Sequence, residues 1–194
     1  MEADAKLDAF WLELEKWMRE SYPERKLVRG EGANPPVLML IGEAPGGEEE
    51  KLGRPFVGKA GKNLNEFLSI VGLDRSALYI TNTVKFRPTR VSAAGRLVNR
   101  TPTQAEIAAF RPWLMRELAF IAPDCVVTLG NVPLKALMGR NAVIGDLHGQ
   151  FVQLEGIRLY PIYHPASLIY NPSLREVYAQ DLLKLAQWAR SIES

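Results

Sequence analysis

Cysteine is almost absent from this sequence, which contains one in 194 residues. A single cysteine excludes an intramolecular disulfide, a zinc site built on cysteines, and an iron–sulfur cluster held by four thiolates of this chain. Cys125 lies in the apolar run Cys125–Leu129, among β-branched residues. We therefore interpret it as a small buried hydrophobic residue and not as a nucleophile.

Histidine is also scarce, since only His148 and His164 are present. The two are too far apart in sequence to form a recognisable metal-binding motif, so no metal site is predicted. Ser167 lies close behind His164, and a Ser–His pair invites comparison with hydrolases. However, the chain has no Gly-x-Ser-x-Gly segment, which argues against an esterase-like hydrolase that uses Ser167.

The chain has no long hydrophobic run and no strong excess of charge. No apolar stretch approaches the ~20 residues that cross a bilayer, and the acidic segment Met1–Lys6 lacks the pattern of a signal peptide. We therefore expect a cytoplasmic protein without a membrane partner. The formal net charge is only +2, which decides neither for nor against a nucleic acid partner.

Charge is nevertheless unevenly distributed along the chain. The segment Lys85–Arg100 contains several basic residues and no acidic residue. A basic, turn-rich segment of this kind is typical of contact with phosphate groups, and equally of a solvated loop. Composition alone leaves both interpretations of this segment open.

Short apolar runs alternate with amphipathic segments. Helical spacing predicts a first helix over Leu7–Tyr22, and the Thr103–Glu106 capping box predicts the start of a long helix. A hairpin is predicted around Glu155-Gly156. The alternation predicts an α/β fold, with a parallel sheet between two layers of helices, in a single domain over residues 1–194. The expected strands are Val37–Ile41, Ala77–Thr81, Cys125–Leu129 and Ile157–Ile162.

Three stretches follow these strands and fall at the carboxyl edge of the expected sheet, where α/β proteins place functional groups. They are Gly42–Gly46, Asn82 and Tyr163–Leu168. Each has a plain structural interpretation on its own: a glycine-rich turn, a turn-forming asparagine and a structural histidine. A Gly-x-Gly-x-x-Gly fingerprint does not follow the first strand, which excludes the usual dinucleotide-binding turn.

The combination is more specific than its parts. The motifs are Gly42-Glu43-Ala44-Pro45-Gly46, Gly53-Arg54-Pro55-Phe56-Val57-Gly58, Thr81-Asn82-Thr83-Val84-Lys85, Asn99-Arg100-Thr101-Pro102 and His164-Pro165-Ala166. In this order, over Leu27–Leu185, they resemble family 4 of the uracil-DNA glycosylase superfamily. The resemblance implies a three-layer α/β/α sandwich with a central four-stranded parallel sheet. It also implies a monofunctional enzyme that flips uracil out of DNA and hydrolyses its N-glycosidic bond, leaving an abasic site.

The resemblance further implies roles for individual residues. Phe56 would stack on the flipped uracil, Asn82 would bind its polar edge, and His164 would stabilise negative charge at O2. Glu43 would place the attacking water or stabilise the cationic sugar. The other implied contacts are Gly42, Ala44 and Glu49 to the base, with Glu49 rejecting thymine at C5, and Lys85, Arg87, Arg100, Ser167 and Leu168 to the DNA.

The chain departs from the family pattern in three places. Family 4 enzymes usually hold a [4Fe–4S] cluster on four cysteines, whereas Phe86 and Phe110 occupy two of those positions here. Packing is therefore expected to replace the cluster, and no cofactor is predicted. The segment Val91–Val98 is an insertion, and Tyr170 stands where an arginine is common. These departures concern DNA affinity and lesion range and leave the expected pocket intact.

Two other functions remain open from the sequence. A glycosylase for another deaminated base, such as hypoxanthine or xanthine, requires only a small change in pocket depth. A catalytically inactive DNA-binding member of the fold has no need for Glu43, Phe56, Asn82 and His164 together. Their joint presence favours an enzyme, which we expect to be a monomer acting on DNA that contains uracil.

Overall fold

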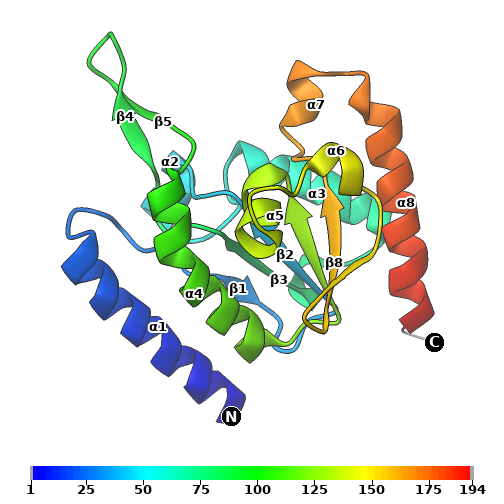
Figure 1. Ribbon diagram of the computed structural model, residues 1–194, viewed down its shortest axis with the longest axis horizontal. Helices are drawn as coiled ribbons and strands as arrows, with labels where there is room; N and C mark the ends of the chain where they lie inside the picture. Colours follow the sequence, from blue (N-terminus) through cyan, green and yellow to red (C-terminus); the bar gives the residue numbers. More distant parts are fainter. Residues whose placement is uncertain (1, 193–194) are drawn as a thin grey trace.

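The structure, a computed structural model, describes residues 2–192. A central sheet lies between two layers of helices, as the sequence predicts (Figure 1). Among the described residues, no helix is both long and apolar enough to cross a membrane.

The sheet has six strands in the order β1-β3-β2-β6-β8-β7. Its four central strands are parallel, which confirms the expected four-stranded parallel sheet. The prediction is incomplete at the edges, because two short strands, β1 and β7, add antiparallel pairs there. The strands of the sheet are β1 (Glu31–Gly32), β2 (Leu38–Gly42), β3 (Leu78–Asn82), β6 (Cys125–Leu129), β7 (Val152–Leu154) and β8 (Ile157–Ile162).

Helices cover both faces of the sheet. Helices α1, α4 and α5 pack on one face, and α3 and α8 pack on the other. The helices are α1 (Glu2–Ser21), α2 (Gly47–Leu52), α3 (Lys59–Val71), the 3₁₀ helix η1 (Arg75–Ala77), α4 (Gln104–Ile121), α5 (Asn131–Met138), α6 (Ile144–Leu147), α7 (Ser167–Tyr170) and α8 (Leu174–Ile192).

Successive side chains of a central strand point to opposite faces and are buried on both. In β2, Met39 and Ile41 belong to the core under α1 and α4, whereas Leu38 and Leu40 belong to the core under α3 and α8. All four are fully buried. Burial on both faces explains why the strand reads as an unbroken apolar run. The two packed layers hold the strands in register and so fix the carboxyl edge of the sheet.

Several local predictions are confirmed. The Thr103 hydroxyl accepts a hydrogen bond from the Glu106 N–H at 3.1 Å, and the Glu106 carboxylate accepts one from the Thr103 N–H at 2.7 Å, at the start of α4. Glu155 and Gly156 have φ angles of 49° and 87° and connect β7 to β8 as a tight hairpin. Cys125 is fully buried in β6, and burial raises the pKa of its thiol to about 12.

The inserted segment is ordered and forms a hairpin of its own. Its strands, β4 (Thr89–Val91) and β5 (Leu97–Asn99), pair with each other and not with the main sheet. Figure 1 shows this β4–β5 hairpin standing out from the body of the protein at the upper left. The sequence predicts the insertion but not its regular pairing.

Candidate active site

The ends of β2 and β3 bring Gly42 and Asn82 side by side, since the two residues are partners in the parallel ladder. A Cβ atom on Gly42 would lie 2.5 Å from Asn82 Oδ1 and 2.6 Å from Phe56 Cζ. The position therefore requires glycine, because any side chain would separate the Phe56 ring from the Asn82 amide. Gly42 thus lies close both to Phe56 and to Asn82, which the sequence also predicts for base binding.

Asn82 is largely buried, and its side-chain amide has no hydrogen-bond partner among the described residues. The residue is 4% exposed, and no hydrogen bond between described residues uses its side chain. The amide is not among the fully enclosed polar groups that lack a partner, so it keeps some contact with solvent and is available to a ligand. The amide presents a donor and an acceptor together, which suits the polar edge of a nucleic acid base.

The loop that carries Phe56 holds it in a strained conformation. Its φ angle is 53°, a left-handed value that costs a non-glycine residue about 1–3 kcal/mol. Arg75 fixes the loop by donating to the Phe56 carbonyl at 3.1 Å and to the Pro55 carbonyl at 2.8 Å. Strain maintained in this way is typical of residues that a binding site must orient.

Glu43 follows Gly42 and lies half-buried at the same edge of the sheet. Its backbone carbonyl accepts a hydrogen bond from the Val84 N–H at 3.1 Å, which ties it to the segment after Asn82. Burial raises the pKa of the Glu43 carboxyl, and a hydrogen bond from the Thr101 side chain opposes the shift. A partly desolvated carboxylate at such an edge can accept a proton or stabilise a cation.

His164 follows β8 and packs against Gly130 at the end of β6, where a Cβ atom on Gly130 would lie 3.2 Å from His164 Cβ. The Nδ1 atom accepts a hydrogen bond from the Ala166 N–H at 3.1 Å, so the neutral ring carries its proton on Nε2. Burial lowers the pKa of His164. The ring is therefore neutral at pH 7 and offers an N–H donor to an oxygen that gains negative charge.

Glu49 and Ala44 support the glycine-rich loop. Glu49 is buried, and its carboxylate accepts hydrogen bonds from the Gly46 N–H at 3.2 Å and the Gly58 N–H at 2.9 Å. Ala44 packs against the core under α1 and α4. The hydrogen bonds of Glu49 join the turns on both sides of α2, while its contact with the C5 side of a base stays a prediction.

The prediction that Lys85 contacts DNA is wrong. Its side chain is fully buried. The ammonium donates to Thr81 Oγ1 at 2.6 Å, the Asn82 carbonyl at 2.5 Å and Glu117 Oε2 at 2.5 Å. Burial lowers the pKa of Lys85, and attraction to Glu117 opposes the shift. The lysine therefore fixes the strand end that carries Asn82 and cannot reach a phosphate group.

Arg87 and Arg100 lie at the base of the β4–β5 hairpin, and both are paired. Arg87 donates to Asn99 Oδ1 at 2.7 Å, and its guanidinium lies 3.3 Å from the Glu50 carboxylate. Arg100 contacts both carboxylate oxygens of Glu106, at 2.6 and 2.7 Å. The pairs offset much of the positive charge, so the observed role of both arginines is to anchor the hairpin, and their contacts with DNA stay predictions.

Ser167 and Leu168 begin α7, directly after the His164 segment. The Ser167 N–H donates to the His164 carbonyl at 2.8 Å. Leu168 packs in part against the core under α3 and α8, whereas Tyr170 at the end of α7 is 87% exposed. Helix α7 stands at the same end of the molecule as the β4–β5 hairpin (Figure 1).

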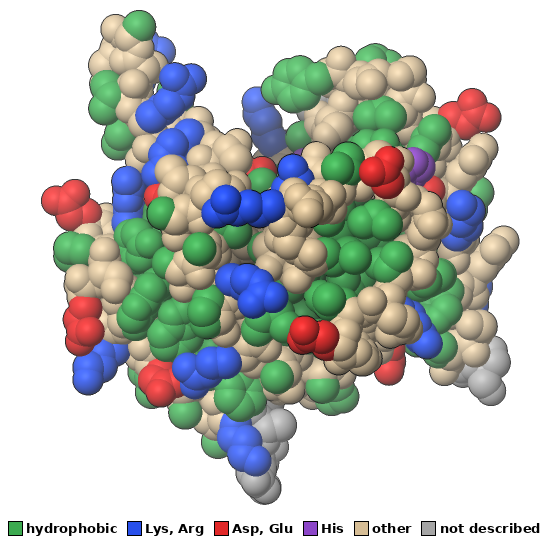
Figure 2. All heavy atoms as spheres, in the orientation of Figure 1, with side chains coloured by type: hydrophobic (Ala, Val, Ile, Leu, Met, Phe, Trp, Pro, Cys, Tyr) green, Lys and Arg blue, Asp and Glu red, His purple; other side chains and the backbone are tan. Residues whose placement is uncertain are grey.

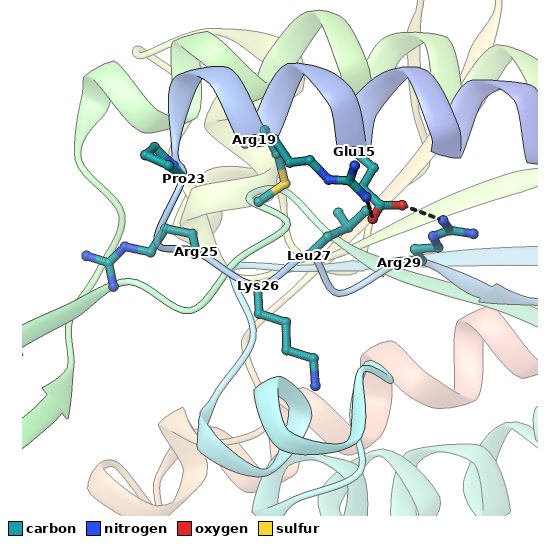
Figure 3. Close-up of a pocket in the computed structure, with 8 residues that line it drawn as sticks. Glu15, Arg19, Pro23, Arg25, Lys26, Leu27 and Arg29 are labelled. Carbon is teal, nitrogen blue, oxygen red and sulfur yellow. Dashed lines mark hydrogen bonds and ion pairs between the residues drawn. The ribbon is translucent and has the colours of Figure 1, made fainter.

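A basic hollow of about 350 Å³ lies between α1 and the segment that follows it (Figure 3). In it, the Glu15 carboxylate accepts hydrogen bonds from Arg19 at 2.7 Å and Arg29 at 3.0 Å. Arg25 points away from this pair and donates to Thr89 Oγ1 at 2.8 Å, at the base of β4. The hollow includes none of the predicted catalytic residues.

Comparison with known proteins agrees with this geometry. Residues 29–187 match the family model of the uracil DNA glycosylase superfamily. This chain belongs to that superfamily. It is 40% identical to a Type-4 uracil-DNA glycosylase of Sulfurisphaera tokodaii, over 84% of this chain and 74% of the relative. A Type-4 uracil-DNA glycosylase of Pyrobaculum aerophilum is 39% identical, over 81% of both chains.

A solved structure supports the fold of this uracil-DNA glycosylase family member. The crystal structure of SMUG2 from Pedobacter heparinus matches with a TM-score of 0.55, over 82% of this chain and 76% of that one. The identity is 18%, so the likeness concerns the arrangement of sheet and helices alone.

The sequence did not identify the residues that fix the ends of the strands carrying the candidate site. Thr83 donates to the Gly42 carbonyl twice, from its N–H and from its hydroxyl, both at 2.9 Å. Glu117 lies on the apolar stripe of α4, beside the buried residues Leu114 and Leu118. A carboxylate on such a stripe is a signal of a buried partner. No comparable signal marks Thr101.

The donor groups of this superfamily member do not fit an iron–sulfur cluster. Over residues 2–192, no group of three or more His, Cys, Asp or Glu side chains is placed to hold a metal ion. Aromatic rings meet where α1 ends instead. The Tyr22 ring centroid lies 4.9 Å from that of Phe86 and 5.7 Å from that of Phe110, and the two phenylalanine rings are 5.6 Å apart.

Proposed function

We propose that this protein removes uracil from DNA by hydrolysing the bond between the base and deoxyribose. The observation that carries the proposal is the Asn82 amide, which has no partner among the described residues and lies, like the Phe56 ring, close to Gly42. Glu43 and His164 follow strands β2 and β8 at the same edge of the sheet. The Type-4 relatives, which are named uracil-DNA glycosylases, support uracil as the base.

In the proposed complex, the flipped uracil lies on the Phe56 ring. The Asn82 amide donates to O4 and accepts a hydrogen bond from N3–H, so both of its polar groups are satisfied by the polar edge of the base. The backbone at Gly42 approaches the base because no side chain intervenes. Extruding the base costs a few kcal/mol, and stacking on an aromatic ring returns about 1–3 kcal/mol.

The proposed reaction breaks the C1′–N1 bond, and its electron pair leaves with the base as an anion whose charge spreads to O2. The Nε2–H of His164 donates to O2, and one preorganised donor of this kind contributes ~3 kcal/mol in oxyanion holes. The oxygen of water bonds to C1′, and its proton passes to the Glu43 carboxylate. The base takes up a proton, so the products are uracil and an abasic site.

Cleavage of labelled DNA at abasic sites by alkali tests this proposal. Uracil opposite guanine is expected to be removed faster than uracil opposite adenine, because a mispaired base is easier to extrude. Asn82→Ala and His164→Ala are each expected to lower the rate by about 10²–10³. Asn141→Ala, at an exposed position, is the matched control.

Two results bear directly on the alternatives. No cleavage of uracil in any sequence or pairing context contradicts the proposal. Cleavage confined to hypoxanthine or xanthine keeps the reaction type and replaces the base.

We also propose that an aromatic cluster of Trp17, Tyr22, Phe86 and Phe110 does the structural work of an iron–sulfur cluster. The rings of Trp17 and Phe110 meet edge to face at 5.1 Å, and the Arg25 guanidinium lies 5.4 Å from the Phe86 ring. These contacts join the end of α1, the segment after β3 and α4. Aromatic pairs of this geometry contribute about 0.5–1.5 kcal/mol each beyond the area that they bury.

Chelation and substitution test the aromatic cluster. The purified protein is expected to contain no iron, and a chelator is expected to leave its unfolding temperature unchanged. Phe110→Ala is expected to cost about 3–5 kcal/mol in urea unfolding, because it removes a fully buried ring and opens a cavity. Phe120→Ala, on the same helix but 37% exposed, is expected to cost less. Stoichiometric iron that chelation removes with loss of stability would contradict the proposal.

A further inference from the structure

The β4–β5 hairpin is a two-stranded ribbon whose outer half stands away from the rest of the described protein (Figure 1). Its register pairs Val91 with Leu97 and Arg90 with Val98. Val91 is 66% and Leu97 63% exposed, and their side chains lie directly opposite each other on one face of the ribbon. Isolated two-stranded hairpins are marginally stable in water, so this one depends on its anchored base.

The base of the hairpin is fixed at several points. Thr89 accepts a hydrogen bond from Arg25 on its hydroxyl at 2.8 Å and from Arg100 on its carbonyl at 3.2 Å. The Arg100 N–H donates to the Pro88 carbonyl at 3.1 Å. At the tip, the Ser92 N–H donates to the Arg96 carbonyl at 2.8 Å and closes the turn. These hydrogen bonds join the base of the hairpin to the body of the protein.

Charge separates the tip from the base. The arginines at the base, Arg87 and Arg100, are paired with carboxylates. Arg90 and Arg96 are exposed, and among the described residues neither guanidinium has an ion-pair or hydrogen-bond partner. No acidic residue lies between Lys85 and Arg100. The outer half of the hairpin thus combines unpaired positive charge with an exposed apolar pair. Figure 2 shows basic and apolar side chains on this protruding segment at the upper left.

The position of the hairpin relates it to the proposed active site. The hairpin and α7 rise from the same end of the molecule, on opposite sides of the edge at which the parallel strands end (Figure 1). A duplex whose base reaches Asn82 and Phe56 would pass between them. A two-stranded ribbon such as this hairpin fits the major groove of DNA. Its unpaired arginines favour contact with phosphate groups.

We propose that the β4–β5 hairpin is a second DNA-binding element, which grips the duplex on the side opposite α7. Arg90 and Arg96 contact phosphate groups, and Val91 and Leu97 contact the groove. The choice of duplex DNA as the ligand rests on the proposed function. The test does not, because it measures binding and not base removal.

The test is the dissociation constant for a fluorescent duplex carrying a stable abasic-site analogue, measured as the salt concentration is raised. Arg90→Ala/Arg96→Ala is expected to weaken binding roughly tenfold at low salt and to lower the salt slope by about 1.8, since each phosphate contact contributes about 0.9. Val91→Ser/Leu97→Ser is expected to weaken binding several-fold with the slope unchanged, because no charge is removed. Lys16→Ala/Lys184→Ala removes two exposed charges elsewhere and is the control.

The outcomes separate this inference from the proposed function. If the Arg90→Ala/Arg96→Ala variant has the same salt slope as the control variant, the proposed role of the hairpin is wrong. If both hairpin variants bind DNA with wild-type affinity, the hairpin is instead a surface for a protein partner. Failure of the wild-type protein to remove uracil contradicts the proposed function but leaves the comparison of affinities valid. Because all four substituted hairpin residues are exposed, unchanged unfolding temperatures are expected to accompany the loss of affinity.

Discussion

Replacing Glu43 with glutamine is expected to lower uracil removal by about 10²–10³-fold while making the folded protein more stable. The loss of activity follows from the loss of the carboxylate charge, which in the proposed reaction accepts the water proton and faces the cationic sugar. The gain in stability follows from burial, which raises the pKa of the Glu43 carboxyl and so disfavours its ionised form in the folded protein. Active sites commonly trade stability for function in this way.

The pH dependence fixes the sign of both effects. The favourable contribution of Glu43 to stability is fully present below its unfolded pKa and is lost as the pH rises through its raised folded pKa. Glu43→Gln is therefore expected to raise the unfolding temperature at about pH 7.5, with the difference vanishing in acid. Activity of the wild-type enzyme is expected to fall as the pH drops through the raised pKa of Glu43, because the carboxylate is then protonated.

Thermal unfolding and excision rates over the same pH range check this prediction. Glu20→Gln, which changes an exposed carboxylate on α1, is the control and is expected to alter neither quantity. A Glu43→Gln protein that is less stable than wild type at neutral pH would show that burial of the ionised carboxylate does not destabilise the fold.

Replacing Lys85 with methionine is expected to destabilise the protein by about 3–5 kcal/mol, because it leaves the Glu117 carboxylate buried without a cation. The Tyr79 hydroxyl, which donates to Glu117 at 3.0 Å, is the only other partner of this carboxylate among the described residues. The exposed pair Lys51–Glu48 provides the control, since Lys51→Met is expected to cost less than about 1 kcal/mol.

A double variant separates stability from positioning. Lys85→Met/Glu117→Met removes both buried charges and is expected to recover much of the lost stability, because an apolar pair can replace a buried ion pair at little cost. Activity is not expected to recover with it. The Asn82 carbonyl and Thr81 hydroxyl lose their donor, and a displaced Asn82 amide can lower the rate by up to about 10²-fold.

Urea unfolding and single-turnover excision on the same four proteins measure both quantities. Recovery of stability together with full activity would show that the ion pair has no positioning role. Recovery of stability without activity would assign the buried lysine to the orientation of Asn82.

The sequence predicts those features that depend on local pattern. The unbroken apolar run of β2, the capping box of α4 and the turn at Glu155-Gly156 each follow from neighbouring residues, and the structure confirms them. The meeting of Gly42 with Asn82 is also predictable, because parallel strands end at one edge of a sheet. These features account for the layers and for the position of the site.

Features that depend on residues far apart in the sequence could not be predicted in this way. From the sequence, the basic residue Lys85 is predicted to contact DNA. Its burial depends on the ion pair with Glu117, which lies on α4. Strand β1 spans Glu31–Gly32 and is defined by its backbone pairing with β3 rather than by its composition. The pairing of Val91 with Leu97 likewise depends on a turn and on anchors at the hairpin base.

The burial of Cys125 makes the wild-type chain a ready background for thiol labelling. Its thiol is shielded inside β6 and its raised pKa keeps the reactive thiolate scarce. A cysteine introduced at Ala93 or Ala94, both exposed at the hairpin tip, would be the only site that a maleimide dye reaches readily. Fluorescence from one defined position can then follow the hairpin as the protein meets, scans and leaves DNA, without removing any native residue beforehand.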